Sequence, residues 1–146
     1  MRNLTIISIF FALFFCFVII LSFNVDADTI TVGPGGAYDF ESINNAISSA
    51  NDNDIILVYS NTYNENLVID KSIDLVSVNG ASSTIIKSAN KNIVTIEIIE
   101  NNVNISGFRI ENLGSTTYSC VKLSSVSNCF IKDNEIKNSN QGNGVY

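Results

Sequence analysis

The sequence predicts an all-β solenoid, in which short parallel strands coil around one axis, with a single short helix near the start. Three observations favour this fold class. Apolar residues recur with a two-residue period through most of the chain beyond Ala27, which is typical of half-buried strands. Nineteen Asn lie in that part of the chain, and Asn tolerates the left-handed backbone conformation of tight turns. Segments also repeat at an interval of about 26 residues, as expected for stacked coils.

The N-terminal segment 1–27 has the pattern of an export signal. Met1–Asn3 carries one positive charge, the segment 4–23 is apolar apart from three hydroxyl residues, and Val25–Ala27 has small or short residues where signal peptidase cleaves. We expect cleavage after Ala27, although a segment of about 20 apolar residues is also long enough to remain as an uncleaved anchor. The predicted organisation is a helical signal peptide at 1–27 and one domain at 28–146.

Composition disfavours several classes of partner. Beyond Ala27 the chain has seven Lys and Arg against thirteen Asp and Glu, and a net charge of −6 disfavours nucleic acid and anionic lipid surfaces. Contact with a membrane is expected only through the N-terminal segment. Two Cys follow Ala27, Cys120 and Cys129, too few for a disulfide-stapled fold.

The domain is expected to begin with a strand and a helix. Thr29–Val32 has the alternation of a short strand and runs into a turn at Gly33–Gly36, whose glycines lack the spacing of a phosphate-binding loop. From Phe40 to Ala50, apolar residues fall at helical spacing, which predicts a short amphipathic helix with Asp39 as its N-cap.

A series of strands follows, with no further helix. They are expected at Ile55–Tyr59, Asn66–Ile69, Ile73–Val78, Thr84–Lys87, Ile93–Ile98, Val103–Ile110, Cys120–Leu123, Cys129–Ile131 and Glu135–Lys137. Parallel strands need no crossover helices when each coil stacks on the one before. The repeat supports this, because Val103–Asn112 aligns with Cys129–Asn138, and Cys120 aligns with Gly144 at a slightly shorter offset.

The alternation also predicts which side chains fill the solenoid. Residues expected to point inward are Leu67, Ile69, Ile73, Leu75, Val78, Val103, Ile105 and Ile131, whereas Asn66, Asp70, Asp74 and Ser77 are expected to face solvent. Each fully buried aliphatic side chain stabilises the fold by about 1.5–3 kcal/mol before entropy is subtracted. Asn112 and Asn134 are expected at turns.

These segments resemble a known group of proteins. The stretch GPGGAYDFESINNAISSANDNDIILVYSNTYNENLVIDKSIDLVSVNGASSTII, with later coils such as SSVSNCFIKDNEIKNSNQGNGVY, resembles the pectin lyase-like superfamily, and more narrowly the NosD-like and adhesin-like proteins of archaeal and bacterial surfaces. The resemblance implies a right-handed parallel β-helix capped at its N-terminal end by the helix Phe40–Ala50. It also implies that Asn61–Glu65, which is similar to a Gly-x-Tyr-x-Glu element of pectin methylesterases, belongs to the early coils and not to a catalytic centre.

Several polar residues have both a structural and a functional interpretation. Asp52 and Asp54 suit a turn or a hard cation. Glu65 beside Tyr63 suits a coil edge or a sugar-binding acid with an aromatic platform. In both cases we favour the structural role. Lys71, in a turn, is expected on a solvated face.

The sequence predicts no catalytic, cofactor-binding or metal-binding residue. Only convergence of charged residues from different coils, such as Glu97, Arg109 and Lys122 on one outer face, would assemble a catalytic site.

The cysteines and the single sequon beyond Ala27 add little chemistry. Cys120 is expected to point outward and Cys129 inward, so both thiols should be free. Copper binding is disfavoured by the lack of His and of any Met beyond the first residue. The sequon Asn104–Ser106 is compatible with glycosylation.

Three functions remain open. The preferred one is an exported, cell-surface β-helix protein with a structural, adhesive or carbohydrate-binding role, whose partners would be cell-wall or extracellular polysaccharide or other surface proteins. The first alternative is the N-terminal part of a carbohydrate-active enzyme, of polysaccharide lyase or pectin esterase type, with its active site beyond the end of this chain. The second is a NosD-like copper-accessory protein of the periplasm. All three are extracytoplasmic. Because the sequence ends part-way through a coil, we expect the domain to be truncated, with its C-terminal coils missing.

Overall fold

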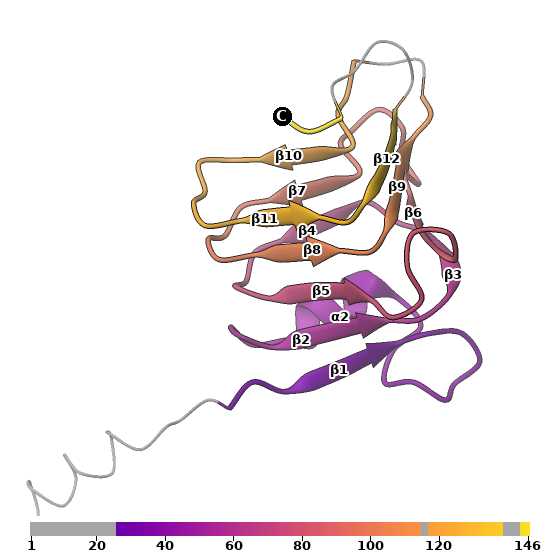
Figure 1. The fold of residues 1–146 in the computed structure, drawn as a ribbon, viewed down its shortest axis with the longest axis vertical. Helices are drawn as coiled ribbons and strands as arrows, with labels where there is room; N and C mark the ends of the chain where they lie inside the picture. Colours follow the sequence, from indigo (N-terminus) through magenta and orange to yellow (C-terminus); the bar gives the residue numbers. More distant parts are fainter. Residues whose placement is uncertain (1–25, 115–116, 139–143) are drawn as a thin grey trace, which may run out of the picture.

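The computed structural model describes residues 26–114, 117–138 and 144–146, and these form a parallel β-helix with one short helix (Figure 1). The expected signal peptide lies almost wholly outside the described residues. Coils stack along one axis, and helix α2 (Ile43–Ser49) lies beside the first of them. The structure therefore confirms the predicted fold class, including the N-terminal position of the helix.

Three parallel sheets form the walls of the solenoid. Sheet A contains β1 (Thr29–Val32), β2 (Ile55–Val58), β5 (Asp74–Ser77), β8 (Asn104–Ser106) and β11 (Phe130–Lys132). Sheet B contains β3 (Asn61–Asn64), β6 (Thr84–Lys87), β9 (Arg109–Asn112) and β12 (Glu135–Asn138). Sheet C contains β4 (Leu67–Ile69), β7 (Ile96–Ile98) and β10 (Val121–Leu123). From β2 to β10, each coil thus contributes one strand to each sheet in turn.

The pairing register confirms the repeat read from the sequence. Phe130 pairs with Asn104 and Glu135 with Arg109, as the alignment of Val103–Asn112 with Cys129–Asn138 predicts. Val145 forms a parallel bridge with Val121, in agreement with the alignment of the residues that precede them.

Two strand predictions were wrong. Asn61–Asn64 is a strand, although only Tyr63 in it is apolar and buried, so its alternation is too short to detect. The expected strand Val103–Ile110 is divided into β8 and β9 because Gly107 turns the corner with φ +80°, a conformation that costs glycine little.

The predicted N-cap was also wrong. The cap of α2 is Ser42, whose Oγ accepts a hydrogen bond from Asn45 N at 3.3 Å. Asp39 instead accepts from the backbone N and the hydroxyl of Thr31, at 2.8 and 2.6 Å, on the edge strand β1. The hydrogen bonds from Thr31 lower the pKa of Asp39.

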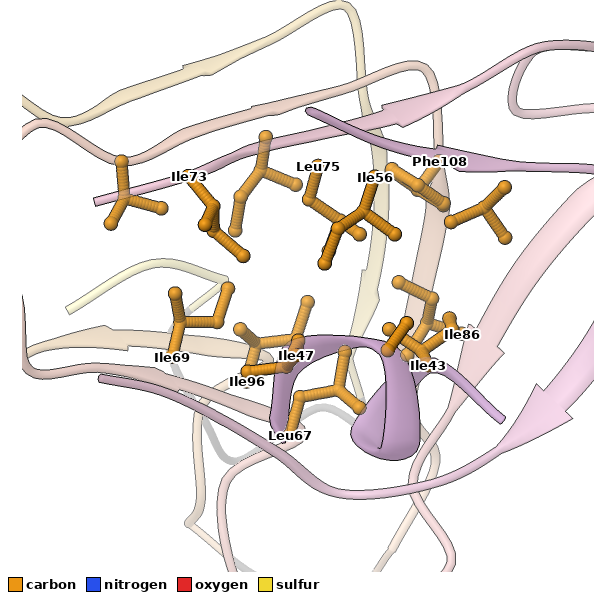
Figure 2. Packing of buried hydrophobic residues seen from close by; sticks show 14 of the residues in the cluster. Ile43, Ile47, Ile56, Leu67, Ile69, Ile73, Leu75, Ile86, Ile96 and Phe108 are labelled. Carbon is orange, nitrogen blue, oxygen red and sulfur yellow. The ribbon is translucent and has the colours of Figure 1, made fainter. Parts of the chain in front are cut away.

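The core is a column of aliphatic side chains between the three sheets. Figure 2 shows Leu75, Ile56 and Phe108 from one side and Leu67, Ile69 and Ile96 from another pointing into the same interior, together with Ile43 and Ile47 of α2. The predicted inward residues Leu67, Ile69, Ile73, Leu75, Val103 and Ile105 are all buried, and Ile131 packs against them while remaining partly exposed.

At the end of β5 the predicted inward and outward residues are reversed. Val78 is 44% exposed, whereas Ser77 is buried in phase with Leu75. Burial of Ser77 is tolerated because its hydroxyl donates to Thr84 Oγ1 at 2.7 Å and accepts from Gly80 N at 2.9 Å. A polar residue can therefore follow the inward phase where the corner supplies its hydrogen bonds.

Asparagines occupy the corners, as the composition indicated. Asn53, Asn102 and Asn128 share one register position before sheet A, and all three have positive φ angles of 75°, 57° and 56°. Asn134, in the turn between β11 and β12, accepts from Phe108 N at 2.8 Å and so joins two coils. Asn112 lies at the end of β9 and donates to Ile93 O at 2.9 Å. These contacts confirm turn roles for both predicted asparagines.

Candidate functional site

The carboxylates of Asp52 and Asp54 are engaged by backbone N–H groups. Asp54 is buried, and its two oxygens accept from Asp28 N at 2.8 Å and Asn51 N at 2.7 Å. Asp52 accepts from Ser72 N at 3.0 Å in the next coil. These hydrogen bonds give both residues a structural role in the turn that leads into sheet A.

Glu65 serves as the N-terminal anchor of α2. Its carboxylate accepts from Ile43 N at 3.0 Å, Asn44 N at 2.9 Å and the Ser42 hydroxyl at 3.0 Å. A carboxylate at this end satisfies N–H groups that have no partner within the helix. The structural interpretation of Glu65 therefore has direct support, and the sugar-binding one has none from these contacts.

Tyr63 and Lys71 are structural as well. The Tyr63 ring is buried and its hydroxyl donates to Tyr59 O at 2.8 Å, while burial raises the pKa of that hydroxyl to about 12. Lys71 was expected on a solvated face, but its Nζ lies 2.9 Å from both Ile47 O and Ser48 O at the C-terminal end of α2. A cation there stabilises carbonyl groups that the helix leaves unpaired.

The orientation predicted for Cys120 was wrong. Cys120 is fully buried, its Sγ lies 3.2 Å from Lys137 O, and burial raises the pKa of the thiol to about 11. It precedes β10, where the chain turns inward and Ser119, Cys120 and Val121 are buried in succession, so the two-residue period does not apply. Cys129 packs against the core, as its predicted inward direction requires, and is half-buried. Both thiols are free, as expected.

The sequon residue Asn104 is engaged across sheet A. Its side-chain Nδ2 donates to Asp74 Oδ1 at 2.6 Å, from β8 to the neighbouring β5. In the folded chain this amide therefore forms part of the outer face of sheet A.

Glu97, Arg109 and Lys122 do not converge on one face. Glu97 and Lys122 are register partners on β7 and β10, and Lys122 Nζ lies 2.8 Å from Glu97 Oε1 on the outer face of sheet C. Arg109 lies on sheet B, where its Nε is 3.2 Å from Glu135 Oε2 and its Nη1 is 3.6 Å from Glu111 Oε1. Two of the three residues thus form an ion pair, and the third belongs to a separate charge network.

A hollow of about 280 Å³ includes Lys122 and opens on the outer side of sheet C. It is lined by Val94, Thr117, Tyr118, Ser119, Lys122 and Tyr146. We call it the tyrosine hollow. Tyr118 is 43% and Tyr146 72% exposed, so both aromatic side chains are accessible to a ligand. Its volume is just below the ~300–1,000 Å³ of typical small-molecule sites, which suits contact with a short stretch of polymer more than enclosure of a ligand.

The two tyrosines come from different coils, and backbone hydrogen bonds hold Tyr146 to the stack. Tyr146 N donates to Val121 O at 3.0 Å, and Leu123 N donates to Tyr146 O at 2.8 Å, which holds the segment 144–146 alongside β10. Tyr118 lies shortly before β10 in the chain. Figure 1 shows β10 next to β7 towards the C-terminal end of the stack.

The ion pair beside the tyrosine hollow is further tied by a hydroxyl. Ser124 Oγ donates to Glu97 Oε1 at 2.9 Å, the same oxygen that Lys122 contacts. The hydrogen bond from Lys122, followed by that from Ser124, lowers the pKa of Glu97, so this carboxylate stays charged into mildly acidic solution.

A second hollow, of about 520 Å³, lies at the same corner, between sheets B and C. Its lining is Ala89, Asn90, Lys91, Asn92, Leu113 and Gly114, with no aromatic side chain among the described residues. The turn 88–95 contributes to both hollows, so they form neighbouring parts of one surface.

The sequence did not single out Tyr118 or Tyr146. Each is an isolated aromatic residue in a polar turn or tail, and only the register of β10 with the segment 144–146 brings them to one hollow. The nearest signal was the alignment of Cys120 with Gly144.

In residues 26–114, 117–138 and 144–146, no group of three or more His, Cys, Asp and Glu side chains is arranged to hold a metal ion. Within the same ranges, no helix has the length and apolar character needed to cross a bilayer.

No protein-family model and no curated protein sequence matches this chain. The solved structures that are similar to it include two pectin methylesterases. One is a pectin methylesterase in complex with a hexasaccharide, with a TM-score of 0.65, 18% sequence identity, and coverage of 73% of this chain and 42% of the other. The second is pectin methylesterase PemA from Erwinia chrysanthemi, with a TM-score of 0.62, 17% identity, and coverage of 77% and 43%.

The chain spans less than half of the length of either enzyme, and sequence identities this low are evidence of the fold alone. That evidence agrees with the three parallel sheets and the stacked coils described above. The chain therefore has a right-handed parallel β-helix fold, as those two enzymes do.

Proposed function

We propose that this chain is an exported, cell-surface β-helix protein that binds carbohydrate through the tyrosine hollow. The observation that carries the proposal is the pairing of two exposed tyrosines, Tyr118 and Tyr146, with hydroxyl and ammonium groups in one hollow. Aromatic rings present an apolar face with a polar tip, which suits the mixed apolar and hydroxyl surface of a sugar ring. Thr117, Ser119 and Lys122 supply hydrogen-bonding groups around them.

Export is supported by the sequence pattern of residues 1–27, a charged start, an apolar segment and a short-residue cleavage site. A location outside the cytoplasm would bring the solenoid to extracellular or cell-wall polysaccharide. The adhesin-like and NosD-like resemblances of the sequence agree with such a location. Of the two, the adhesin-like one is compatible with glycan binding.

A second candidate is the N-terminal part of a carbohydrate-active enzyme. It is favoured by the fold likeness to two pectin methylesterases, one of them in complex with a hexasaccharide. Against it, Arg109 is paired with both Glu111 and Glu135 on sheet B, so these charges are engaged.

The binding proposal is tested with the full chain expressed for export and applied to an array of plant and microbial polysaccharides. Replacing Tyr118 or Tyr146 with Ala should weaken binding by at least about fivefold, since each loses about 1 kcal/mol of aromatic contact. Phe130→Ala is the matched control, because Phe130 is 61% exposed on β11, outside the hollow.

Equal loss in the Phe130 variant, or no loss in either Tyr variant, would contradict binding at the tyrosine hollow. Methanol release and unsaturated-product absorbance with methyl-esterified pectin separate the two candidates. Turnover by the wild-type chain that Arg109→Ala abolishes would favour the enzyme.

A further inference from the structure

We propose that Glu97 sets the charge class of the glycan that the tyrosine hollow accepts, by holding Lys122 in an ion pair and so selecting uncharged glycans over polyuronates. This inference rests on the proposed function, since it concerns the ligand of the same hollow. It assigns a specificity-determining role to a residue that does not itself line the hollow.

The hollow contains the charge of Lys122. Among the described residues that line it, Lys122 is the one charged side chain. A free ammonium group there would attract the carboxylate of an acidic sugar. In the structure, however, Lys122 Nζ lies 2.8 Å from Glu97 Oε1, so its charge is already compensated on the neighbouring strand.

The ion pair of Glu97 and Lys122 is held in one geometry. Glu97 and Lys122 are direct register partners, and Ser124 Oγ donates to the same carboxylate oxygen at 2.9 Å. The Glu97 side chain is 29% and the Lys122 side chain 40% exposed, so the ammonium group also reaches solvent. An ammonium group has three hydrogens, and those that Glu97 does not take can donate to sugar hydroxyls. Lys122 thus acts as a hydrogen-bond donor within an ion pair that has little net charge.

The charge of the whole chain also favours an uncharged ligand. The net charge is −6, so a polyanionic glycan is repelled at long range and gains little from a compensated Lys at short range. An uncharged glycan avoids both effects and keeps the aromatic and hydrogen-bonding contacts. The hollow is therefore suited to neutral hexose polymers and to esterified uronans, whose carboxyl groups carry no charge.

Glu97→Gln tests the inference directly. Gln keeps the shape and the acceptor for Lys122 and Ser124 but leaves the ammonium charge uncompensated. Binding of de-esterified polygalacturonan should rise by about fivefold at low ionic strength, the upper end for an exposed ion pair, and the gain should disappear at about 1 M salt. Binding of methyl-esterified polygalacturonan and mannan should change by less than about twofold. Affinities are measured by calorimetry with the full exported chain.

Glu135→Gln is the matched control, because it makes the same change in net charge on sheet B, where Glu135 pairs with Arg109 and Lys137. Three outcomes would overturn the role of Glu97 and leave the proposed function intact. The first is an equal gain in Glu135→Gln, and the second is no gain in Glu97→Gln. The third is a wild-type chain that already binds the acidic polymer as tightly as the neutral one. Failure of the wild-type chain and of both variants to bind any glycan would overturn the proposed function and this inference with it.

Discussion

Single residues show where the alternation of the sequence stops being a guide. Within strands the two-residue period holds, and Leu67 and Ile69 are buried as predicted. At corners it fails, because the backbone turns inward and successive side chains can share one environment. Cys120 lies at such a corner between two buried neighbours, Ser119 and Val121, and is therefore buried where the period predicted exposure.

This difference has a consequence for thiol reactivity. The thiolate is the reactive form, and in Cys120 burial both blocks access and raises the pKa to about 11. In the native protein near neutral pH, a maleimide should label Cys129, which is half-buried, and leave Cys120 unlabelled. Peptide mapping by mass spectrometry gives the extent at each site.

Denatured protein is the control, and there both thiols should be labelled. If Cys120 in the native protein were labelled as fast as Cys129, then either the corner before β10 opens or Cys120 is not buried.

At the scale of elements, α2 is held at both ends by side chains that flank one strand. Glu65 precedes β4 and Lys71 follows it, and they contact the N-terminal and C-terminal ends of α2 respectively. The helix has only seven residues, too few to be stable alone in water. Its stability therefore depends on burial of its apolar stripe and on these two side chains.

The two anchors should contribute unequally. Glu65→Ala leaves two backbone N–H groups and the Ser42 hydroxyl without their acceptor, and should lower the free energy of unfolding by about 2–3 kcal/mol. Lys71→Met keeps the apolar stem and should cost about 1 kcal/mol. Urea denaturation followed by circular dichroism measures both values.

Glu41→Ala is the matched control for the loss of a carboxylate, since Glu41 is exposed and accepts one hydrogen bond, from Gly35 N at 3.2 Å. Its effect should stay within about 0.5 kcal/mol. If Glu65→Ala were as mild as this control, α2 would not depend on the carboxylate.

The same elements indicate how far sequence reasoning reached. The helix was predictable because its apolar stripe is local, and most strands because alternation is local too. The helix anchors were not, since Glu65 is far from Ile43 in the chain and Lys71 is far from Ile47, and nothing in the intervening sequence marks the contact. The tyrosine hollow was missed for the same reason: Tyr118 and Tyr146 meet only through strand register.

At the scale of the whole molecule, the column that unites the coils also contains titratable groups. Cys120 and Tyr63 are buried, and burial raises their pKa values from the ordinary 9.0 and 10.0 to about 11 and about 12. For a group whose pKa is raised by folding, the stabilisation is complete below the ordinary pKa and is lost as pH rises towards the folded value. Alkaline solution should therefore destabilise the entire solenoid.

We expect the free energy of unfolding to fall between about pH 9 and about pH 12. In Cys120→Ala, the decrease in the free energy of unfolding between about pH 9 and pH 11 should be smaller than in wild type. The difference over this range should be on the order of 2 kcal/mol. Urea titrations at closely spaced pH values compare the variant with wild type, which differs from it at Cys120 alone. Parallel curves for the two proteins would contradict a deprotonation penalty at Cys120.

The corners of the solenoid absorb differences in coil length. Successive register partners on sheet A are unevenly spaced along the chain. The interval from Ile55 to Asp74 is the shortest, and that from Asp74 to Asn104 is the longest. The strands nevertheless remain in register. The surplus is housed outside the stack, in turns such as 88–95 beside the two hollows. The molecule is in this respect a display scaffold: a peptide grafted into that turn would be presented next to the tyrosine hollow while the spacing along the axis stayed unchanged.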